Sequence, residues 1–245
     1  GESSGATRLR QRAIATLDFL LSPKMLLRLL LVVMVVGLVL TRSRGGNSAF
    51  FTSLLIVGVL AIFFWRRMAP VTVVLITSLI VIDIVLIGSW IGLNKVVERM
   101  EQTAILEANK RGEETFEERA IAVRDILPSL QKNLLLGTGA GTFEMAFPPY
   151  RNPAIQGRYQ HAHNDYVEIA SDTGLLGFAL LAALVLASAW RALAVMRRHP
   201  SNLARGMAFA SLMAIVAMLF HATVEFNLQI PAVALTFCLM LALPW

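Results

Sequence analysis

Two histidines in the second half of the chain have the chemistry and the position of a reactive site. His161 and His163 end a long polar region and stand just before an apolar segment of membrane length. An imidazole at a membrane surface is suited to take a proton from a hydroxyl group or, once protonated, to bind a phosphate. In an extended chain the two rings point to the same side, but a metal site needs a further ligand and no spacing selects one. We also expect Asn164 to cap the next helix and to hold an imidazole or a sugar hydroxyl.

Arginines give the sequence a second kind of candidate site residue, one that binds anions. Arg42 and Arg44 stand before two glycines in a short turn between apolar segments. Their planar guanidiniums suit the paired oxygens of a phosphate, but they equally suit lipid head groups or an acidic loop, and the charge pattern leaves both interpretations open. Arg119 falls in an expected loop helix, where the pattern favours a solvated charge paired with Glu118 or with a residue one turn away.

Apolar residues form long blocks, which sets the fold class. Hydrophobic residues make up 56% of the chain and charged residues 16%, a balance typical of an integral membrane protein. We predict an all-α fold, a polytopic transmembrane helix bundle of about six spans with a long, partly helical loop. The spans are expected at about residues 25–40, 49–65, 71–93, 173–193, 207–220 and 232–245. The chain thus divides into a basic flank with three spans (residues 1–93), the loop (94–172) and three more spans (173–245).

Basic residues set the expected orientation in the bilayer. Lys and Arg gather before the first span, after the second span, and between the fourth and fifth spans. Short connections rich in Lys and Arg stay in the cytoplasm. The turn with Arg42 and Arg44, the long loop and the turn after the fifth span are therefore predicted to share the outer face of the membrane. The net charge of +6 follows from this topology and gives no reason to propose nucleic acid as a partner.

The long loop carries further local signals. Apolar residues at helical spacing predict a helix over 113–133, which Pro128 is able to kink. The glycine-rich run 137–143 is expected to close this helix as a tight turn, since its spacing is not that of a dinucleotide or P-loop motif. Residues 147–151 are expected to continue as extended chain with their aromatic rings at the membrane interface.

Three titratable residues lie outside these motifs. Asp83 falls within the third span, where we expect a polar packing contact inside the bundle rather than catalysis. His221 and Glu225 are four residues apart and share a face if the fifth helix continues outward. We expect this pair to brace the floor of the site rather than to react.

Taken in order, the motifs resemble a known family. The segments that carry the resemblance are Ser43-Arg44-Gly45-Gly46, Glu118-Arg119, the run from Gly137 to Phe143, and His161-Ala162-His163-Asn164 with Asp172-Thr173-Gly174-Leu175-Leu176-Gly177. Over about residues 29–231 the chain is similar to the O-antigen ligase and Wzy-type polymerase superfamily. The resemblance implies a multi-pass glycosyltransferase of the bacterial inner membrane. Such an enzyme takes a glycan from undecaprenyl diphosphate on the periplasmic side, with no metal, cofactor or nucleotide-sugar donor.

The same resemblance assigns roles to residues. It implies that Arg44 and Arg119 are the family's two periplasmic arginines and that His163 is its loop histidine, so these three are the catalytic candidates. The substrate-binding candidates are Arg42, His161 and Asn164. Two guanidiniums would stabilise the charge on the departing diphosphate. A neutral His163 would take the proton from the acceptor hydroxyl, and a protonated His163 would bind phosphate instead.

The resemblance leaves the acceptor and the exact activity open. A lipid acceptor corresponds to an O-antigen ligase, and a glycan acceptor to a Wzy-type polymerase of lipid-linked repeat units. The alternative class is a non-catalytic transport or assembly component, although the inverted repeats and broken helices of a transporter are not seen in the sequence. Family members usually have more spans, and this chain begins with Gly1, so the N-terminal half of the protein is expected to be missing here.

Overall fold

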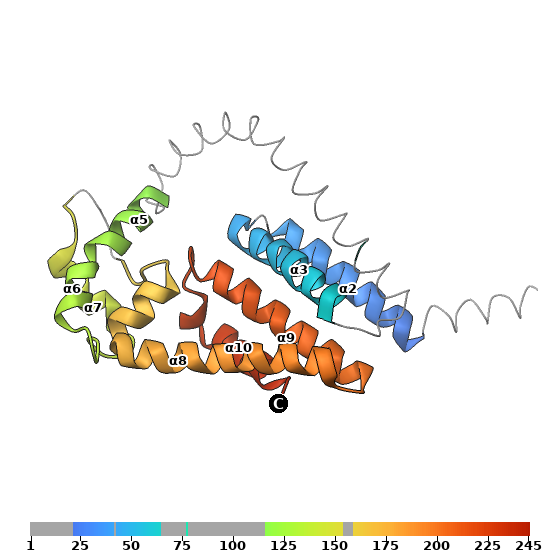
Figure 1. Ribbon diagram of the computed structural model, residues 1–245. Helices are drawn as coiled ribbons and strands as arrows, with labels where there is room; N and C mark the ends of the chain where they lie inside the picture. The colour runs from blue at the N-terminus through green and yellow to red at the C-terminus, as the bar shows by residue number, and fades with distance from the viewer. Residues whose placement is uncertain (1–21, 42, 65–76, 78–115, 154–158) are drawn as a thin grey trace, which may run out of the picture. The chain divides into compact units, whose positions relative to one another are not determined.

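The computed structural model describes residues 22–41, 43–64, 77, 116–153 and 159–245, and all regular structure in these ranges is helical (Figure 1). Helices form here because an apolar block in a membrane must satisfy its backbone hydrogen bonds within the segment. The predicted all-α fold class is confirmed. The chain divides into two units, residues 1–47 and residues 48–245, and each is described by itself.

The first unit contains helix α2, Pro23–Leu40, and the start of α3, Arg44–Phe64. α2 is rich in leucine and valine and covers the first expected span. α3 begins at Arg44 instead of residue 49, because the hydroxyl of Ser43 accepts a hydrogen bond from the N–H of Gly46 at 3.1 Å and caps the helix. The predicted polar turn is therefore shorter than expected, and Arg44 lies in the first turn of α3.

Long apolar helices make up most of the second unit. They are the rest of α3, α8 at Asp165–Arg198 and α9 at Asn202–His221, followed by the shorter α10 at Pro231–Ala242. In the part of the chain that the structure describes, α3, α8 and α9 are long and apolar enough to cross a membrane. The expected third span lies outside the described residues except for Thr77. The number of about six spans therefore stays a prediction.

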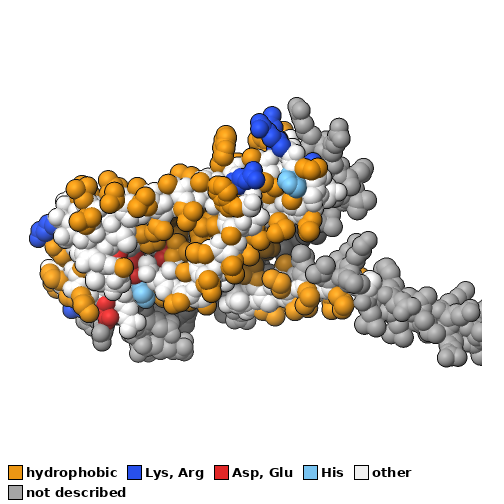
Figure 2. Space-filling model, turned by 90° about the horizontal axis from the view of Figure 1, so that it is seen from below, with side chains coloured by type: hydrophobic (Ala, Val, Ile, Leu, Met, Phe, Trp, Pro, Cys, Tyr) orange, Lys and Arg blue, Asp and Glu red, His pale blue; other side chains and the backbone are white. Residues whose placement is uncertain are grey.

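Small side chains let α3, α8 and α9 approach one another closely. Their shared core consists of Val57, Ala61, Ala192, Val195, Met196, Ala208 and Leu212. Alanine at a helix crossing allows close backbone contact, which favours association in lipid, where no hydrophobic effect draws helices together. A second cluster joins α9 to α10 and contains Ile215, Phe237 and Leu241. Apolar side chains cover the middle of the face shown in Figure 2, whereas charged and histidine side chains lie toward its ends.

α8 is interrupted at Gly174. This glycine has a φ of 67°, outside the helical region, so a short helical stretch from Asp165 meets the membrane segment at a kink. The whole of α8 has 34 residues and a length of about 51 Å, which exceeds the hydrocarbon thickness of about 30 Å. α8 is therefore longer than a single crossing requires, and the predicted fourth span, 173–193, corresponds to the part after the kink.

The described part of the polar loop folds as short helices around its own small core. They are α5 Phe116–Asp125, α6 Leu127–Lys132, α7 Phe143–Ala146 and the 3-10 helix η1 Pro148–Tyr150. The helix expected over 113–133 is broken at Ile126, because Pro128 stands in the first turn of α6 and lacks an N–H to donate backward. The core residues are Ala122, Ile126, Phe143, Phe147, Tyr159 and Ala162. The extended chain expected over 147–151 is wrong: η1 occupies this segment, and Phe147 is buried in the core instead of lying at the membrane interface.

Candidate functional site

Asn164 sets the point where α8 begins. Its Oδ1 accepts a hydrogen bond from the N–H of Val167 at 3.1 Å, which satisfies one of the free donors of the first turn. Its Nδ2 donates to the carbonyl of Thr223 at 3.0 Å. The predicted cap is confirmed, and the same side chain also ties α8 to the segment after α9.

Replacing Asn164 with alanine is expected to lower the free energy of unfolding by about 1 kcal/mol through loss of the cap, and further because the carbonyl of Thr223 loses its donor. Asn164→Asp keeps the capping oxygen and should recover part of the loss. Ser201→Ala, which removes the corresponding cap of α9, is the matched control for the cap alone. Thermal unfolding in detergent measures all three variants, and a melting temperature of Asn164→Ala equal to that of the unmodified protein would contradict the assignment.

The backbone turns sharply at His163. This residue has a φ of 50°, the only positive value among the described non-glycine residues. Histidine, asparagine and aspartate enter this region more readily than other side chains. His161 and His163 are therefore not joined by an extended chain, the condition under which their alternating spacing would turn both rings to the same side.

Phe226 nevertheless brings the two imidazoles together. The ring of His161 stacks on it at a centroid distance of 4.3 Å and an interplanar angle of 13°. The ring of His163 meets it edge-on, at 4.9 Å and 82°. Aromatic contacts of this kind prefer defined orientations, so Phe226, from the segment that follows α9, restricts the directions of both rings.

Glu168 holds His161 from inside the protein. It lies in the first turns of α8 and is 1% exposed. Its Oε1 lies 2.7 Å from Nδ1 of His161, and its Oε2 accepts the N–H of Ala162 at 2.7 Å. A buried carboxylate is tolerated when its oxygens are engaged, and here both are. His161 is thus held at its Nδ1 edge while the rest of its ring stays partly exposed.

Glu225 bridges Arg119 and His163. Its Oε1 accepts a hydrogen bond from Nη1 of Arg119 at 3.1 Å, and its Oε2 lies 3.4 Å from Nδ1 of His163. The side chains of Arg119, Glu225 and His163 are 29%, 35% and 12% exposed. The helix pattern favoured a partner for Arg119 on its own helix, whereas the partner that the structure provides is 106 residues away. The side chain of Glu118 lies outside the described residues.

These contacts define an arginine–histidine cluster. Its members are Arg119, His161, His163, Glu168, Glu225 and Phe226. Within the described residues, the buried Nε of Arg119 has no hydrogen-bond partner, so this guanidinium keeps a donor for a ligand. No group of three or more His, Cys, Asp or Glu in the same ranges is placed to hold a metal ion. The arrangement is suited to bind an anion next to a base.

The segment after α9 is fastened to the start of α8. The N–H of Asp165 donates to the carbonyl of Ala222 at 2.9 Å, and Oδ2 of Asp165 accepts the N–H of Leu228 at 3.0 Å. The hydroxyl of Tyr166 donates to the carbonyl of Leu219 at 2.6 Å. These bonds place the segment that carries Glu225 and Phe226 against α8.

The same bonds explain why α9 stops. The helix ends at His221, where the N–H groups of Thr223 and Val224 make tighter turns to the carbonyls of Phe220 and His221. The carbonyls of Ala222 and Thr223 accept hydrogen bonds from the start of α8 instead of from the next turn of α9. The predicted common helical face for His221 and Glu225 is therefore wrong. Glu225 lies beyond the helix and reaches Arg119 and His163 instead.

The glycine-rich run is a turn docked on the kink of α8. The N–H of Thr138 donates to the carbonyl of Ser171 at 2.9 Å. The N–H of Gly139 donates to the carbonyl of Asp172 at 2.8 Å, and the N–H of Gly141 to its Oδ2 at 2.7 Å. The predicted tight turn is confirmed. Because these amides bond within the protein, the run positions α8 and does not cradle a phosphate.

Two glycines allow this docking. Gly137 and Gly174 have φ values of 70° and 67°, in the left-handed region that favours glycine. A Cβ atom on Gly137 would overlap the carbonyl oxygen of Asp172, and one on Gly174 would overlap the carbonyl oxygen of Leu135. The loop and the kink therefore meet backbone to backbone.

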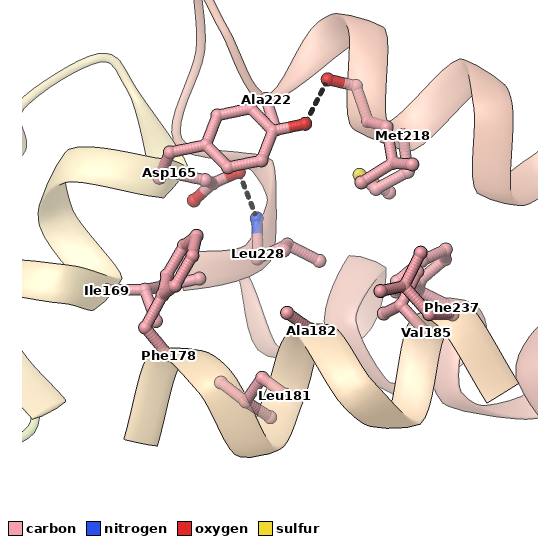
Figure 3. Close-up of a pocket in the computed structure, with 13 residues that line it drawn as sticks. Asp165, Ile169, Phe178, Leu181, Ala182, Val185, Met218, Ala222, Leu228 and Phe237 are labelled. Carbon is pink, nitrogen blue, oxygen red and sulfur yellow. Dashed lines mark hydrogen bonds between the residues drawn. The ribbon is translucent and has the colours of Figure 1, made fainter. Parts of the chain in front are cut away.

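An apolar pocket lies beside the start of α8 (Figure 3). It has a volume of about 180 Å³ and is formed between α8, α9 and α10. Its lining is almost entirely apolar and includes Phe178, Leu181, Met218 and Phe237, and Asp165 and Tyr166 from the first turn of α8 also line it.

The structure brings together Arg119, His161, His163 and Asn164. Arg44 is the first residue of α3 and belongs to the other unit, and its side chain lies outside the described residues, as do Arg42 and Asp83. The convergence of Arg44 with the cluster therefore stays a prediction.

Glu168 and Phe226 are site residues that the motifs do not reveal. For Glu168 a local signal exists, since it stands one turn after the capping Asn164, where an acidic side chain is able to reach back to the backbone before the helix. Phe226 has no such signal, because its contacts join segments that are distant in the sequence.

Comparison with known proteins gives one match. A family model described as O-antigen ligase matches residues 29–182. No curated protein and no solved structure matches the chain. The matched range contains Arg44, Arg119 and His163 but ends before Glu225 and Phe226, so the bridging carboxylate is an observation of the structure alone.

Proposed function

The chain belongs to the O-antigen ligase family, and from this we propose that it transfers a glycan from undecaprenyl diphosphate to an acceptor sugar on the periplasmic side of the bacterial inner membrane. Family membership makes it a membrane protein of ligase or polymerase type that works on lipid-linked glycans. The observation that carries the proposal is the bridge from Glu225 to Arg119 and His163. It supports the proposal because it joins a guanidinium from the short helix α5 to an imidazole just before the long apolar helix α8.

Arg119 is proposed to bind and stabilise the departing diphosphate. Departure of undecaprenyl diphosphate builds negative charge on phosphate oxygens, and a guanidinium stabilises this charge in the transition state while keeping its own charge. Its Nη1 already holds a carboxylate, and its Nε has no partner among the described residues. Arg44 is proposed as the second guanidinium, and Arg42 as a residue that helps to bind the donor.

His163 is proposed to act as the base. The acceptor hydroxyl attacks the anomeric carbon, its proton passes to Nε2 of His163, and the bond from that carbon to the diphosphate oxygen breaks with its electron pair leaving on the diphosphate. Direct displacement of this kind inverts the anomeric carbon. A protonated His163 that binds phosphate is the alternative role. His161 is proposed to contact the substrate, and Asn164, whose amide bonds to Val167 and Thr223, to hold the turn at His163.

The apolar pocket supports a lipid-linked donor. The segment of α8 from Phe178 to Leu186 contributes several of its lining residues, and Asp165 lines it at the start of the same helix. A pocket lined by apolar side chains beside a polar site suits an isoprenoid chain that carries a charged head. We therefore place part of the donor's polyprenyl chain there.

A strain that lacks the protein tests the proposed function through the electrophoretic ladder of its surface glycan. Loss of glycan from the lipid acceptor, with chain lengths kept, identifies a ligase. Loss of long chains identifies a polymerase. An unchanged ladder would refute both activities, and the unmodified gene supplied in trans should restore the pattern.

Arg119→Lys is expected to lower glycan transfer by about 10-fold to 100-fold, because lysine keeps the charge but loses the planar fork, and a hydrogen bond to a charged group contributes about 1.5–3 kcal/mol. The matched control is Arg124→Lys, on the exposed end of the same helix, which should keep the full rate. Transfer rates of the full-length proteins in detergent provide the measurement. Equal rates for both variants would argue against paired phosphate recognition by Arg119.

A further inference from the structure

Glu225 occupies the position on Arg119 that the proposed function gives to a phosphate. Its Oε1 accepts the hydrogen bond from Nη1 at 3.1 Å, while its Oε2 reaches Nδ1 of His163 at the longer distance of 3.4 Å. The carboxylate of Glu225 therefore pairs with Arg119, the proposed ligand of the donor. It makes only a long contact with His163, the proposed base for the acceptor. Both contacts are made at once, through different oxygens, and the one with His163 is the longer.

The contact with Arg119 is the one that a donor is able to replace. Both side chains are about one-third exposed, and an ion pair in contact with solvent is weak. A diphosphate carries more charge than one carboxylate and offers oxygens to both edges of the guanidinium. The buried Nε of Arg119, which has no partner among the described residues, provides a donor that Glu225 does not use.

Neighbouring contacts keep the imidazole of His163 and the segment that carries Glu225 close to each other. The contact with Phe226 holds the imidazole at 82° to the phenyl ring, and Glu225 immediately precedes Phe226 in the chain. The segment is anchored by the bond from Leu228 to Asp165. A hydrogen bond that is long before substrate binds often shortens in the reactive complex, and a small rotation of the Glu225 side chain is enough here.

We propose that Glu225 couples donor binding to the activation of His163. The inference rests on the proposed function. When the diphosphate binds Arg119, it displaces Oε1 of Glu225, and the released carboxylate closes onto Nδ1 of His163. The proton on Nδ1 is then held by the carboxylate, so Nε2 presents its lone pair to the acceptor hydroxyl and the imidazolium that forms is stabilised. Glu225 is thus a positioning residue that makes base activation depend on the presence of the donor.

The coupling predicts opposite effects on rate and on donor affinity. In Glu225→Gln the neutral amide no longer competes for Arg119, so undecaprenyl diphosphate should bind several-fold more tightly. The same variant lacks the charge that orients and stabilises His163, so kcat should fall at least about 10-fold. Loss of a merely structural contact would weaken both binding and rate, which makes the gain in affinity the diagnostic result.

The experiment uses the full-length protein in detergent and measures kcat for glycan transfer together with the Kd for undecaprenyl diphosphate. Glu225→Asp keeps the charge and should recover part of kcat with an affinity near that of the unmodified protein. Asp125→Asn is the matched control, since it makes the same change from carboxylate to amide at the end of α5, where Asp125 accepts the N–H of Asn152. It should leave both quantities unchanged.

Two outcomes separate the coupling from the activity itself. If the unmodified protein transfers glycan but Glu225→Gln keeps its kcat, or binds undecaprenyl diphosphate no more tightly, the coupling is overturned and the proposed function stands. If the unmodified protein transfers no glycan from its lipid-linked donor, the proposed function is overturned and the coupling with it.

Discussion

His163→Gln is expected to lose about 100-fold or more of its glycan transfer rate, because a positioned general base contributes about 10²–10⁴-fold to a reaction of this kind. Glutamine fills a similar volume but does not take a proton at neutral pH. Transfer from a lipid-linked donor by the purified full-length protein gives the rate. Binding of undecaprenyl diphosphate should change much less than the rate.

The positive φ of His163 calls for a second variant. His163→Asn tolerates the left-handed backbone at this position, so it separates loss of the base from loss of the turn and should be as inactive as the glutamine variant. His199→Gln is the control, since His199 lies at the far end of α8, where its Nδ1 accepts the N–H of Ser201. Near-normal transfer by both His163 variants would remove this residue from the proton transfer.

Gly174→Ala is expected to lower the free energy of unfolding by several kcal/mol or to prevent folding. An L-residue in the left-handed region costs about 1–2 kcal/mol, and the added Cβ would also overlap the backbone carbonyl oxygen of Leu135, which has no room to yield. Gly137→Ala should have a similar effect, because its Cβ would overlap the carbonyl oxygen of Asp172 from the other side of the same contact. Thermal unfolding in detergent measures both variants.

Gly206→Ala is the matched control for these substitutions. Gly206 lies within α9 and has open space where a Cβ would stand. Alanine there should be neutral or stabilise the protein by up to about 1 kcal/mol, since glycine is a poor helix former. Folding of Gly174→Ala with an unchanged melting temperature would show that the loop does not need close contact with the kink.

The sequence predicts the features that depend on local signals. The apolar blocks predict an all-helical membrane protein, because length and hydropathy alone decide whether a helix is able to cross a bilayer. Asn164 predicts the start of α8, and Pro128 the break between α5 and α6, because a cap and a missing N–H act within one turn. The glycine-rich run predicts a turn for the same reason.

The contacts that build the cluster are long-range, and local patterns do not contain them. The four-residue spacing would place Glu225 beside His221 on one helix. Hydrogen bonds from α8 instead end α9 at His221, and Glu225 lies against Arg119. The alternating spacing of His161 and His163 would turn both rings to one side of an extended chain, whereas the backbone at His163 is left-handed. The positions of Glu225 and of the two histidines both differ from the local pattern because tertiary hydrogen bonds determine the backbone there.

The break in α8 also decides how firmly the polar loop is held. It leaves the N–H groups of Leu175 and Leu176 without partners in their own helix, and the carbonyls of Leu134 and Leu135 accept them at 2.8 Å and 3.2 Å. If the loop lifted away here, two amides at the edge of the hydrocarbon would lose their acceptors, at a cost of several kcal/mol each. Detachment of this end of the loop is therefore opposed by the loss of two backbone hydrogen bonds.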